Sequence, residues 1–258
     1  MADELTKSEP PAVDVSLIRS LHFMMMSYDL SKNPGRWRPG SIWVERESDN
    51  AVVYEGPDVE LLPGLMDELV DAMEGSELPV IVRAAMAHLN LTMIHPFSDG
   101  NGRMARCLQT FVLARERIVA PEFSSIEEYL GAHTREDYDV LAEVGQGGWH
   151  PERDAGPWVR FCLEAHEQQA RRLLQRLRDV ERLWELCAEL VAKRGLPDRM
   201  VPAVVDAARG FRLRNSSYRR VVVRSEAVEL SDHTASRDLR ALVDRAPWGG
   251  GIRRSTSR

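Results

Sequence analysis

Hydrophobic residues recur at helical spacing along most of this chain. After a lead-in of about fifteen residues, the period of SLIRSLHFMMMSYDL predicts a first helix. Apolar side chains share one face of segment 79–94, and proline suits the first turn of a helix, so we expect a buried helix that runs into His95. Another helix is predicted after Gly102, because RMARCLQTFVLARERI joins strong helix formers with an apolar face ahead of Pro121.

A different pattern separates the first helix from these two. NPGRWRPG interrupts the helical period, and SIWVERESDNAVVYEGP then contains two short runs rich in Ile, Trp, Val and Tyr around Ser48-Asp49-Asn50. The pattern predicts a β-hairpin at about 41–54. From Val59 to Arg194 we predict helices and loops only, so the hairpin would project alone from a helical body. An isolated hairpin is marginally stable without other elements to pack on.

The longest helix is expected at about 158–194. Its apolar positions between Leu163 and Val191 are first seven residues apart and then three or four residues apart. A dimeric coiled coil of about four heptads would satisfy this stripe, but we favour packing onto the preceding helices. Gly-Leu-Pro at 195–197 ends the helix. The sequence therefore predicts a mainly α protein with two domains, at 1–195 and 196–258.

Composition places the chain among ordinary globular proteins. Its 258 residues are 43% hydrophobic and 29% charged, and no apolar run approaches the roughly 18 residues of a membrane helix. The acidic, polar N-terminus is unlike a signal peptide, so we expect a cytoplasmic protein without membrane contact. Three widely spaced cysteines form no CxxC pair, and we interpret Cys107, Cys162 and Cys187 as reduced, buried thiols.

Charge is divided unevenly along the chain. Residues 196–258 carry a net charge of +6, whereas the remainder carries −12. In this basic tail a turn at Ser231-Asp232 precedes a helix, which looks like the second helix of a winged helix-turn-helix that binds DNA. The predicted phosphate contacts are Arg237, Arg240, Arg253 and Arg254, the last two on a short wing. A solvated tail, or a structural or dimerising module, is the alternative.

The segment 95–106, HPFSDGNGRMAR, contains groups suited to binding phosphate. Gly100 and Gly102 permit a backbone whose N–H groups point into one cavity, at the start of a helix whose dipole favours an anion. Arg103 and Arg106 lie three residues apart on the new helix and are positioned to clamp further phosphate oxygens. These residues predict a phosphate-binding loop.

Two other residues of this segment supply chemistry. Asp99 is suited to hold Mg²⁺, which prefers one or two carboxylates together with substrate phosphates. His95, with an unperturbed pKa of about 6.5, is suited to take a proton from an attacking hydroxyl near neutral pH. Each residue taken singly is a weak signal, and the combination within twelve positions is what carries weight.

This segment resembles the signature of the Fic family, His-Pro-Phe-x-(Asp/Glu)-Gly-Asn-Gly-Arg-x-x-Arg, at all nine specified positions. Chance agreement is on the order of 10⁻¹² per start point, at roughly one in twenty per position. The resemblance extends over about 21–194. It implies a helical bundle with the signature on the loop between two central helices, and a β-hairpin flap over the active site.

The resemblance also implies roles for individual residues. They are His95 as the group that activates a target hydroxyl, Phe97 as the anchor of the loop, Asp99 as the Mg²⁺ ligand, Gly100, Asn101, Gly102 and Arg103 as contacts to the ATP phosphates, and Arg106 as the γ-phosphate contact. The implied reaction transfers AMP from ATP to a Ser, Thr or Tyr hydroxyl of a protein, or of this chain itself. The target would dock on the flap by strand addition.

Two alternatives remain for the activity. The chain could be a DNA-binding regulator whose Fic domain is a nucleotide sensor or scaffold, or the same site could remove AMP from modified proteins. A homodimer is compatible with either alternative.

The resemblance raises a question of regulation. Many Fic proteins are silenced by a helix carrying (Ser/Thr)-x-x-x-Glu-(Gly/Asn), whose glutamate occupies the γ-phosphate arginine. The two Glu-Gly steps here, 55–56 and 74–75, lack Ser or Thr four residues before the glutamate. We therefore predict no internal inhibitory glutamate of this form, which leaves an antitoxin-like partner, a divergent inhibitor segment or constitutive activity. A glutamate of this chain bonded to Arg106 would overturn the prediction.

Overall fold

The computed structural model describes residues 13–46, 49, 51–75, 77–115, 126–226 and 229–245. It divides into two compact units, Met1–Arg172 and Leu173–Arg258. The division falls within helix α8 (Gly156–Lys193), whose later part contributes Cys187 and Val191 to the core of the second unit. It therefore differs from the expected boundary after residue 195.

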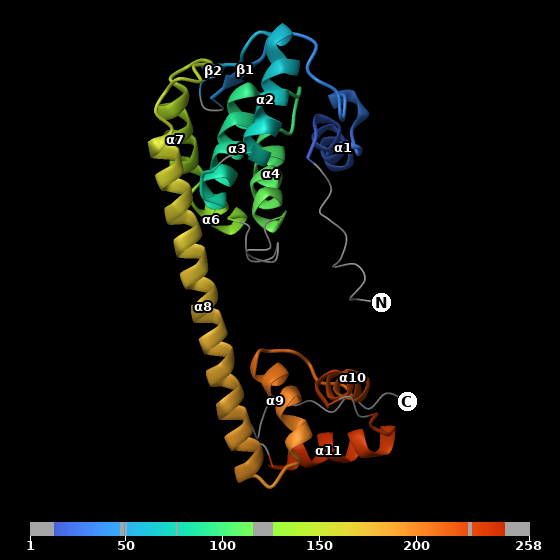
Figure 1. Cartoon of the computed structure of the whole chain (residues 1–258). Coiled ribbons are helices and arrows are strands. Elements are labelled where there is room, and N and C mark those ends of the chain that lie inside the picture. The colour runs from blue at the N-terminus through green and yellow to red at the C-terminus, as the bar shows by residue number, and fades with distance from the viewer. Residues whose placement is uncertain are drawn as a thin grey trace. The chain divides into compact units, whose positions relative to one another are not determined.

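The first unit is a helical bundle with one hairpin, as predicted (Figure 1). Its helices before the signature loop are α1 (Val15–Met26), α2 (Leu62–Gly75) and α3 (Val80–Ile94). Those after the loop are α4 (Asn101–Arg115), α6 (Glu127–Ala132), α7 (Thr134–Gly145) and the first part of α8. Short 3₁₀ turns lie at η1 (Leu30–Lys32) and η2 (Val59–Leu61). Helix α1 ends at Met26, before the predicted limit, and the Asp29 side chain, which accepts from Ser31 N–H, caps the separate turn η1 that follows.

The hairpin prediction is confirmed. Strands β1 (Trp43–Glu45) and β2 (Val52–Glu55) pair antiparallel, with Val44 opposite Tyr54. The hairpin is fixed to the body through β2: Tyr54 Oη donates to the carbonyl of Met93 at 2.7 Å, and Glu55 N–H donates to Gly147 O at 3.1 Å. These bonds explain why two short strands are stable here.

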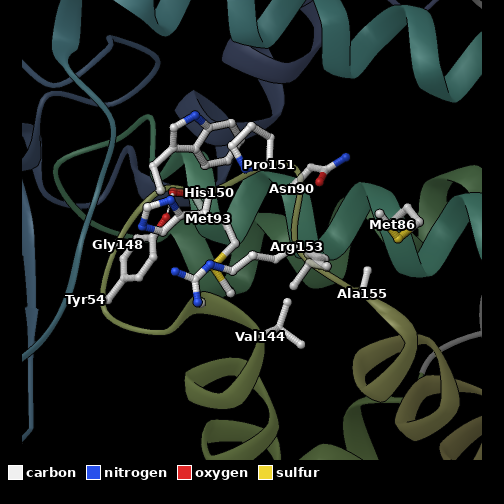
Figure 2. A pocket seen from close by; sticks show the side chains of 13 residues that line it. Tyr54, Met86, Asn90, Met93, Val144, Gly148, His150, Pro151, Arg153 and Ala155 are labelled. Atoms are coloured by element: carbon white, nitrogen blue, oxygen red, sulfur yellow. Dashed lines mark hydrogen bonds between the residues drawn. The ribbon is translucent and has the colours of Figure 1, made fainter.

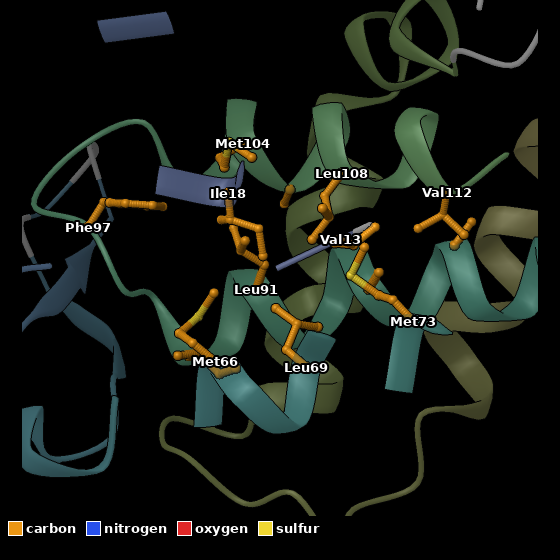
Figure 3. Close-up of a cluster of buried hydrophobic side chains, with 14 of the residues drawn as sticks. Val13, Ile18, Met66, Leu69, Met73, Leu91, Phe97, Met104, Leu108 and Val112 are labelled. Carbon is orange, nitrogen blue, oxygen red and sulfur yellow. The ribbon is translucent and has the colours of Figure 1, made fainter. Parts of the chain in front are cut away.

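Helix α3 lies at the centre of the unit and is buried on several faces. We predicted one buried face for this segment, yet Ala84 and Leu91 on one side of the helix and Ala85 and Leu89 on another are all almost fully buried. A helix that is apolar around most of its circumference is typical of a central position. Figure 3 shows Leu91 of α3 among side chains from its neighbours, including Ile18, Met66 and Leu108.

The second unit contains the end of α8, the turn η3 (Asp198–Met200) and helices α9 (Val201–Ala208), α10 (Asn215–Glu226) and α11 (Asp232–Arg245). Ser231 caps α11, since its hydroxyl accepts from Thr234 N–H at 3.2 Å. The predicted wing, with Arg253 and Arg254, lies outside the described residues, whereas Arg237 and Arg240 are exposed on α11.

A buried carboxylate joins the elements of this second unit. Asp238 of α11 is 3% exposed and accepts from Arg199 Nε at 2.8 Å, from Arg199 Nη2 at 3.0 Å and from Tyr218 Oη at 3.0 Å. Arg199 belongs to η3 and Tyr218 to α10. The carboxylate therefore holds three segments that are far apart in sequence.

Three smaller predictions can be compared with the structure. Cys162 and Cys187 are buried and free of disulfides, while Cys107 is free but only half-buried. Along the predicted stripe of α8, Leu163, Leu177, Val180 and Trp184 are exposed, while Cys187 and Val191 are buried in the core that α8 forms with the following helices, so the favoured packing onto the preceding helices is not observed. Within the part of the chain that the structure describes, no helix is long and apolar enough to cross a membrane.

Candidate active site

The signature loop begins at a left-handed residue. His95 follows the last residue of α3 with φ 51° and ψ 55°, and its N–H donates to Leu91 O as a C-cap. Non-glycine residues rarely adopt this conformation, which costs roughly 1 kcal/mol or more. The turn ends α3 and places the imidazole at the mouth of the loop that leads to α4.

The backbone of α3 fixes the tautomer of His95. Its Nδ1 lies 3.0 Å from the carbonyl oxygen of Thr92, which can only accept, so Nδ1–H donates and Nε2 keeps its lone pair. Burial lowers the pKa of His95, and the Arg38 guanidinium lowers it further against the opposing Thr92 bond. The imidazole is therefore held neutral, with Nε2 ready to accept a proton.

Phe97 anchors the loop, and Asn101 closes it. The Phe97 ring is fully buried in the core. The Asn101 amide accepts from Phe97 N–H at 2.9 Å and donates to Phe97 O at 2.8 Å. Because the Asn101 side chain is used within the loop, its predicted contact with a nucleotide would come from its backbone N–H, and it stays a prediction.

A residue that sequence reasoning missed supports the loop from α1. The His22 ring stacks on Phe97 with centroids 3.6 Å apart, its Nε2 donates to Asp99 O at 2.9 Å, and its Nδ1 accepts from Gly35 N–H at 2.9 Å. Burial is the main cause of its lowered pKa. Nothing in the apolar period of the first helix distinguishes this histidine from a core residue.

The two glycines of the loop serve different needs. Gly100 has φ +79°, and a Cβ there would lie 3.0 Å from Met26 Sδ, so this chain itself requires glycine. A Cβ at Gly102 would meet only Arg106 Nη1, at 3.7 Å. Gly102 is exposed in the first turn of α4, where backbone N–H groups have no partner within the helix. This open space beside N–H groups suits an anion.

Charged side chains surround the start of α4. Asp99 Oδ1 accepts from Gly100 N–H at 2.6 Å, and its Oδ2 lies 3.4 Å from Lys32 Nζ. Arg103 Nη1 donates to Tyr28 Oη at 3.2 Å, while its Nη2 lies 3.9 Å from Asp99 Oδ1. Lys32 and Tyr28 come from the segment after α1, and no local pattern predicts that they reach this loop.

Asp99 is the candidate metal ligand of the loop. Among the residues that the structure places, no group of three His, Cys, Asp or Glu could hold a metal ion by itself. The Asp99 side chain is 40% exposed. A single accessible carboxylate beside a phosphate-binding turn fits Mg²⁺, which completes its shell with water and substrate phosphates.

Arg106 is bonded to a glutamate of this chain, which overturns our expectation. Its Nε donates to Glu127 Oε1 of α6 at 2.9 Å. The segment around Glu127 lacks the (Ser/Thr)-x-x-x-Glu-(Gly/Asn) pattern, with Phe123 four residues before and Glu128 after it, so the pattern search could not find it. The predicted γ-phosphate contact thus already has an acidic partner from within the chain.

A second acidic residue lies close to this pair. Asp137 of α7 is 7% exposed, and its Oδ1 has no hydrogen-bond partner within the described ranges. Burial raises its pKa to about 6, with Arg106 opposing and Glu127 adding to the shift. Arg106 therefore sits in the field of two carboxylates.

Comparison with known proteins identifies this loop and the fold around it. Residues 12–113 match the Fic/DOC family. The chain is similar to the Fic/DOC family over this stretch. The chain is also 27% identical over 173 residues to a Caenorhabditis elegans protein named protein adenylyltransferase fic-1, a match that covers 66% of this chain and 30% of that protein.

Two further similarities agree with this family. A Culex quinquefasciatus protein named protein adenylyltransferase Fic is 35% identical over 123 residues, which cover 45% of this chain and 22% of that protein. The chain therefore spans less than a third of the length of these curated relatives. A Fic family protein from Desulfovibrio desulfuricans G20 has the same fold, with TM-score 0.59, 22% identity, and coverage of 91% of this chain and 63% of that one.

A small cavity of the first unit lies apart from the signature loop. It measures about 50 Å³ and is lined by β2, α3 and the segment after α7. Figure 2 shows Tyr54, Met93, His150 and Arg153 around it. His95 and the residues of α4 do not line it, so the cavity is separate from the predicted phosphate contacts.

Proposed function

We propose that this chain is a protein adenylyltransferase, which transfers AMP from ATP to a Ser, Thr or Tyr hydroxyl of a protein. The observation that carries the proposal is the neutral His95, whose Nδ1–H is held by Thr92 O and whose Nε2 is ready to accept a proton beside the start of α4. The names of the relatives from C. elegans and C. quinquefasciatus support the same activity.

The reaction is a displacement at the α-phosphorus. The target oxygen forms a bond to the α-phosphorus while the bond from phosphorus to the bridging oxygen of pyrophosphate breaks. The hydroxyl proton passes to His95 Nε2, and pyrophosphate leaves with the bonding electron pair. Positioning of the reacting groups and stabilisation of the developing negative charge supply most of the rate.

The start of α4 binds the ATP phosphates in this proposal. N–H groups of its first turn, the space at Gly102 and the Arg103 guanidinium would hold them, and Arg106 would orient the γ-phosphate. Asp99 would hold Mg²⁺, which when bound neutralises negative charge on the phosphates. Glu127 holds Arg106 Nε and would compete with ATP for this guanidinium, so Glu127, or a separate antitoxin-like partner acting at this place, would control access.

The flap would receive the target. Trp43 of β1 is 54% exposed and Val52 of β2 is 57% exposed, so the hairpin presents apolar side chains to solvent. A target segment added to a strand edge would be bound through main-chain hydrogen bonds, which are largely independent of sequence. The same geometry admits a segment of this chain as the target.

A second candidate function is DNA binding by the second unit. The exposed Arg237 and Arg240 on α11 favour it, since guanidinium groups on one helix suit phosphate contacts. Under this hypothesis the Fic domain is a nucleotide sensor or scaffold. Affinity for duplex DNA should fall steeply between low and moderate salt, and an unchanged affinity would contradict phosphate contacts.

The test of the main proposal is transfer of label from ATP. The purified protein is incubated with Mg²⁺, a protein extract and ATP labelled at the α-phosphate, with γ-labelled ATP in parallel. We expect protein-bound label from the α position alone. His95→Ala should reduce the rate by at least roughly 10²- to 10⁴-fold, as loss of a general base does, while ATP binding persists. His233→Ala, at an exposed histidine of the second unit, is the matched control and should change neither.

Other outcomes would contradict the proposal. Label from the γ position would indicate phosphorylation. Near-normal transfer by His95→Ala would remove its assigned role. Loss of label from a previously AMP-modified protein, without any gain from ATP, would favour removal of AMP by the same site.

A further inference from the structure

Arg38 is a buried cation that the signature does not include. It lies between η1 and β1 and is 3% exposed. Burial lowers the pKa of its guanidinium, and the Asp58 carboxylate opposes that shift. A buried charge of this kind is costly unless its donors are satisfied.

Each nitrogen of Arg38 donates to a backbone carbonyl group. Its own N–H donates to Pro96 O at 2.9 Å, and its Nε donates to His95 O at 3.0 Å. Its Nη1 donates to Gly40 O at 2.5 Å, and its Nη2 donates to Pro57 O. One residue therefore satisfies carbonyl groups from three separate segments of the chain.

These carbonyl groups lie at the two ends of the hairpin and at the start of the signature loop. Gly40 precedes β1 and Pro57 follows β2, so they flank the hairpin on both sides. His95 and Pro96 are the first residues of the signature loop. The Arg38 side chain thus ties both ends of the flap to the backbone of the residue that we propose as the general base.

The packing around the guanidinium leaves little freedom. A Cβ at Gly56 would lie 3.4 Å from Arg38 Nη2 and 2.8 Å from Ile42 Cγ2, so the chain leaving the flap passes close to this group. The planar guanidinium presents its N–H donors in fixed directions, whereas a lysine ammonium is a point charge on a flexible stem.

An apolar side chain of similar volume would leave the carbonyls of His95, Gly40 and Pro57 without this donor, which costs stability. It would also remove the directed connection between the flap and His95.

We propose that Arg38 is a positioning residue, which fixes the flap relative to His95 so that a target docked on the flap presents its hydroxyl to His95 Nε2. This inference rests on the proposed function. Because Arg38 bonds to backbone of the flap and of residues 95–96, its replacement should affect the target and leave ATP binding unchanged.

The test compares Arg38→Lys and Arg38→Met with Arg36→Lys, a control at an exposed arginine in the same segment. Misplacement by about 1 Å can cost roughly 100-fold, so we expect kcat/KM for the target to fall by about 10- to 100-fold in both Arg38 variants. The dissociation constant of ATP should stay within about twofold of the wild type, and the control should match the wild type.

Hydrogen exchange gives a readout without catalysis. Peptides that contain β1 and β2 should exchange faster in the Arg38 variants, while peptides of α2 keep the wild-type rate. If the wild type transfers no AMP, the proposed function fails, and this exchange measurement still decides whether Arg38 fixes the flap.

Specific results would overturn the inference. Unchanged exchange of the flap peptides would show that Arg38 does not fix the hairpin. Unchanged kcat/KM, or equal losses in target turnover and ATP affinity, would leave Arg38 with a structural role only. Recovery of full turnover by Arg38→Lys would show that charge suffices and that the fork geometry is not needed.

Discussion

At the scale of single residues, the environment of His95 sets the pH range of the proposed activity. Burial and Arg38 lower its pKa below the ordinary value of about 6.5, and a base is lost only as pH falls through its pKa in the folded enzyme. We therefore expect the acid limb of kcat/KM for the target to lie below pH 6.5. A pH–rate profile measures it, and a limb with its midpoint above 6.5 would show that another group controls the rate.

The pairing of Arg106 with Glu127 makes a second prediction at this scale. Glu127→Gln removes the negative charge that competes with ATP for Arg106. Because both side chains are partly exposed, the gain is about 0.2–1 kcal/mol, or up to roughly fivefold tighter ATP binding. Isothermal titration with ATP measures it, with Glu128→Gln, at the neighbouring glutamate, as the control. Weaker binding by Glu127→Gln would show that Glu127 supports the site.

The sequence predicted those site residues that lie together in the chain. His95, Phe97 and Asp99 occupy one loop, so a contiguous signature identifies them. His22, Arg38 and Glu127 contact the candidate site from outside the loop. They lie 73, 57 and 32 positions from His95 in the sequence, and Glu127 lies 21 positions from Arg106, to which it is bonded. Their proximity depends on tertiary packing, which no local pattern encodes.

At the scale of elements, periodicity predicted which segments are helices and missed some of their details. It located α3, α4 and the hairpin, because their apolar patterns and turn residues agree with their final states. It did not predict that α3 would be buried on several faces, since apolar periodicity alone does not show how many neighbours a helix has. The end of α1 was missed because a separate turn, η1, capped by Asp29, follows the helix within the same apolar pattern.

The buried Asp238 carboxylate makes a prediction for the helices of the second unit. Asp238→Ala would leave Arg199 and Tyr218 without their shared acceptor, and removal of one partner from a buried pair costs about 3–5 kcal/mol. We expect a loss of this size in the free energy of unfolding, measured by urea denaturation followed by circular dichroism. Asp244→Ala, at an exposed position of the same helix, should change stability by less than about 0.5 kcal/mol.

A loss below about 1 kcal/mol in Asp238→Ala would show that the pair is not important for packing of α11. Both variants remove one carboxylate, so a difference in stability between them cannot come from the change in net charge.

At the scale of the whole molecule, buried histidines predict a loss of stability in acid. His88 donates from Nδ1 to Gln109 Oε1 at 2.6 Å, and Gln109 Nε2 donates to His166 Nε2 at 3.1 Å, which links α3, α4 and α8. Burial lowers the pKa of His88 to about 4. Between pH 6.5 and 4 the unfolded chain binds a proton there that the folded chain does not, so stability falls as pH falls.

For His88 the expected loss is about 2 kcal/mol between pH 8 and pH 5, from an unfolded pKa of about 6.5. Urea denaturation at several pH values measures it. His88→Gln should flatten this slope even if it lowers stability at every pH. An equal slope in both proteins would mean that His88 binds its proton as readily in the folded state as in the unfolded chain.

The division into units was only partly foreseen at this scale. Gly195 and Pro197 correctly mark the end of a long helix, whose last residue is Lys193. A helix end need not be the limit of a unit, however, because the later residues of α8 pack into the second core. The change in charge along the sequence indicates where the basic tail begins, but it does not show which hydrophobic core the side chains of α8 belong to.

The left-handed backbone at His95 sets a limit for protein engineering. Glycine adopts φ 51° and ψ 55° without the roughly 1 kcal/mol penalty that an L side chain carries, so His95→Gly should relax the loop. A library screened for heat resistance alone would therefore enrich a protein that has lost its proposed base. Thermostabilised versions of this chain should be selected for turnover as well, because at this position the fold and the chemistry favour different amino acids.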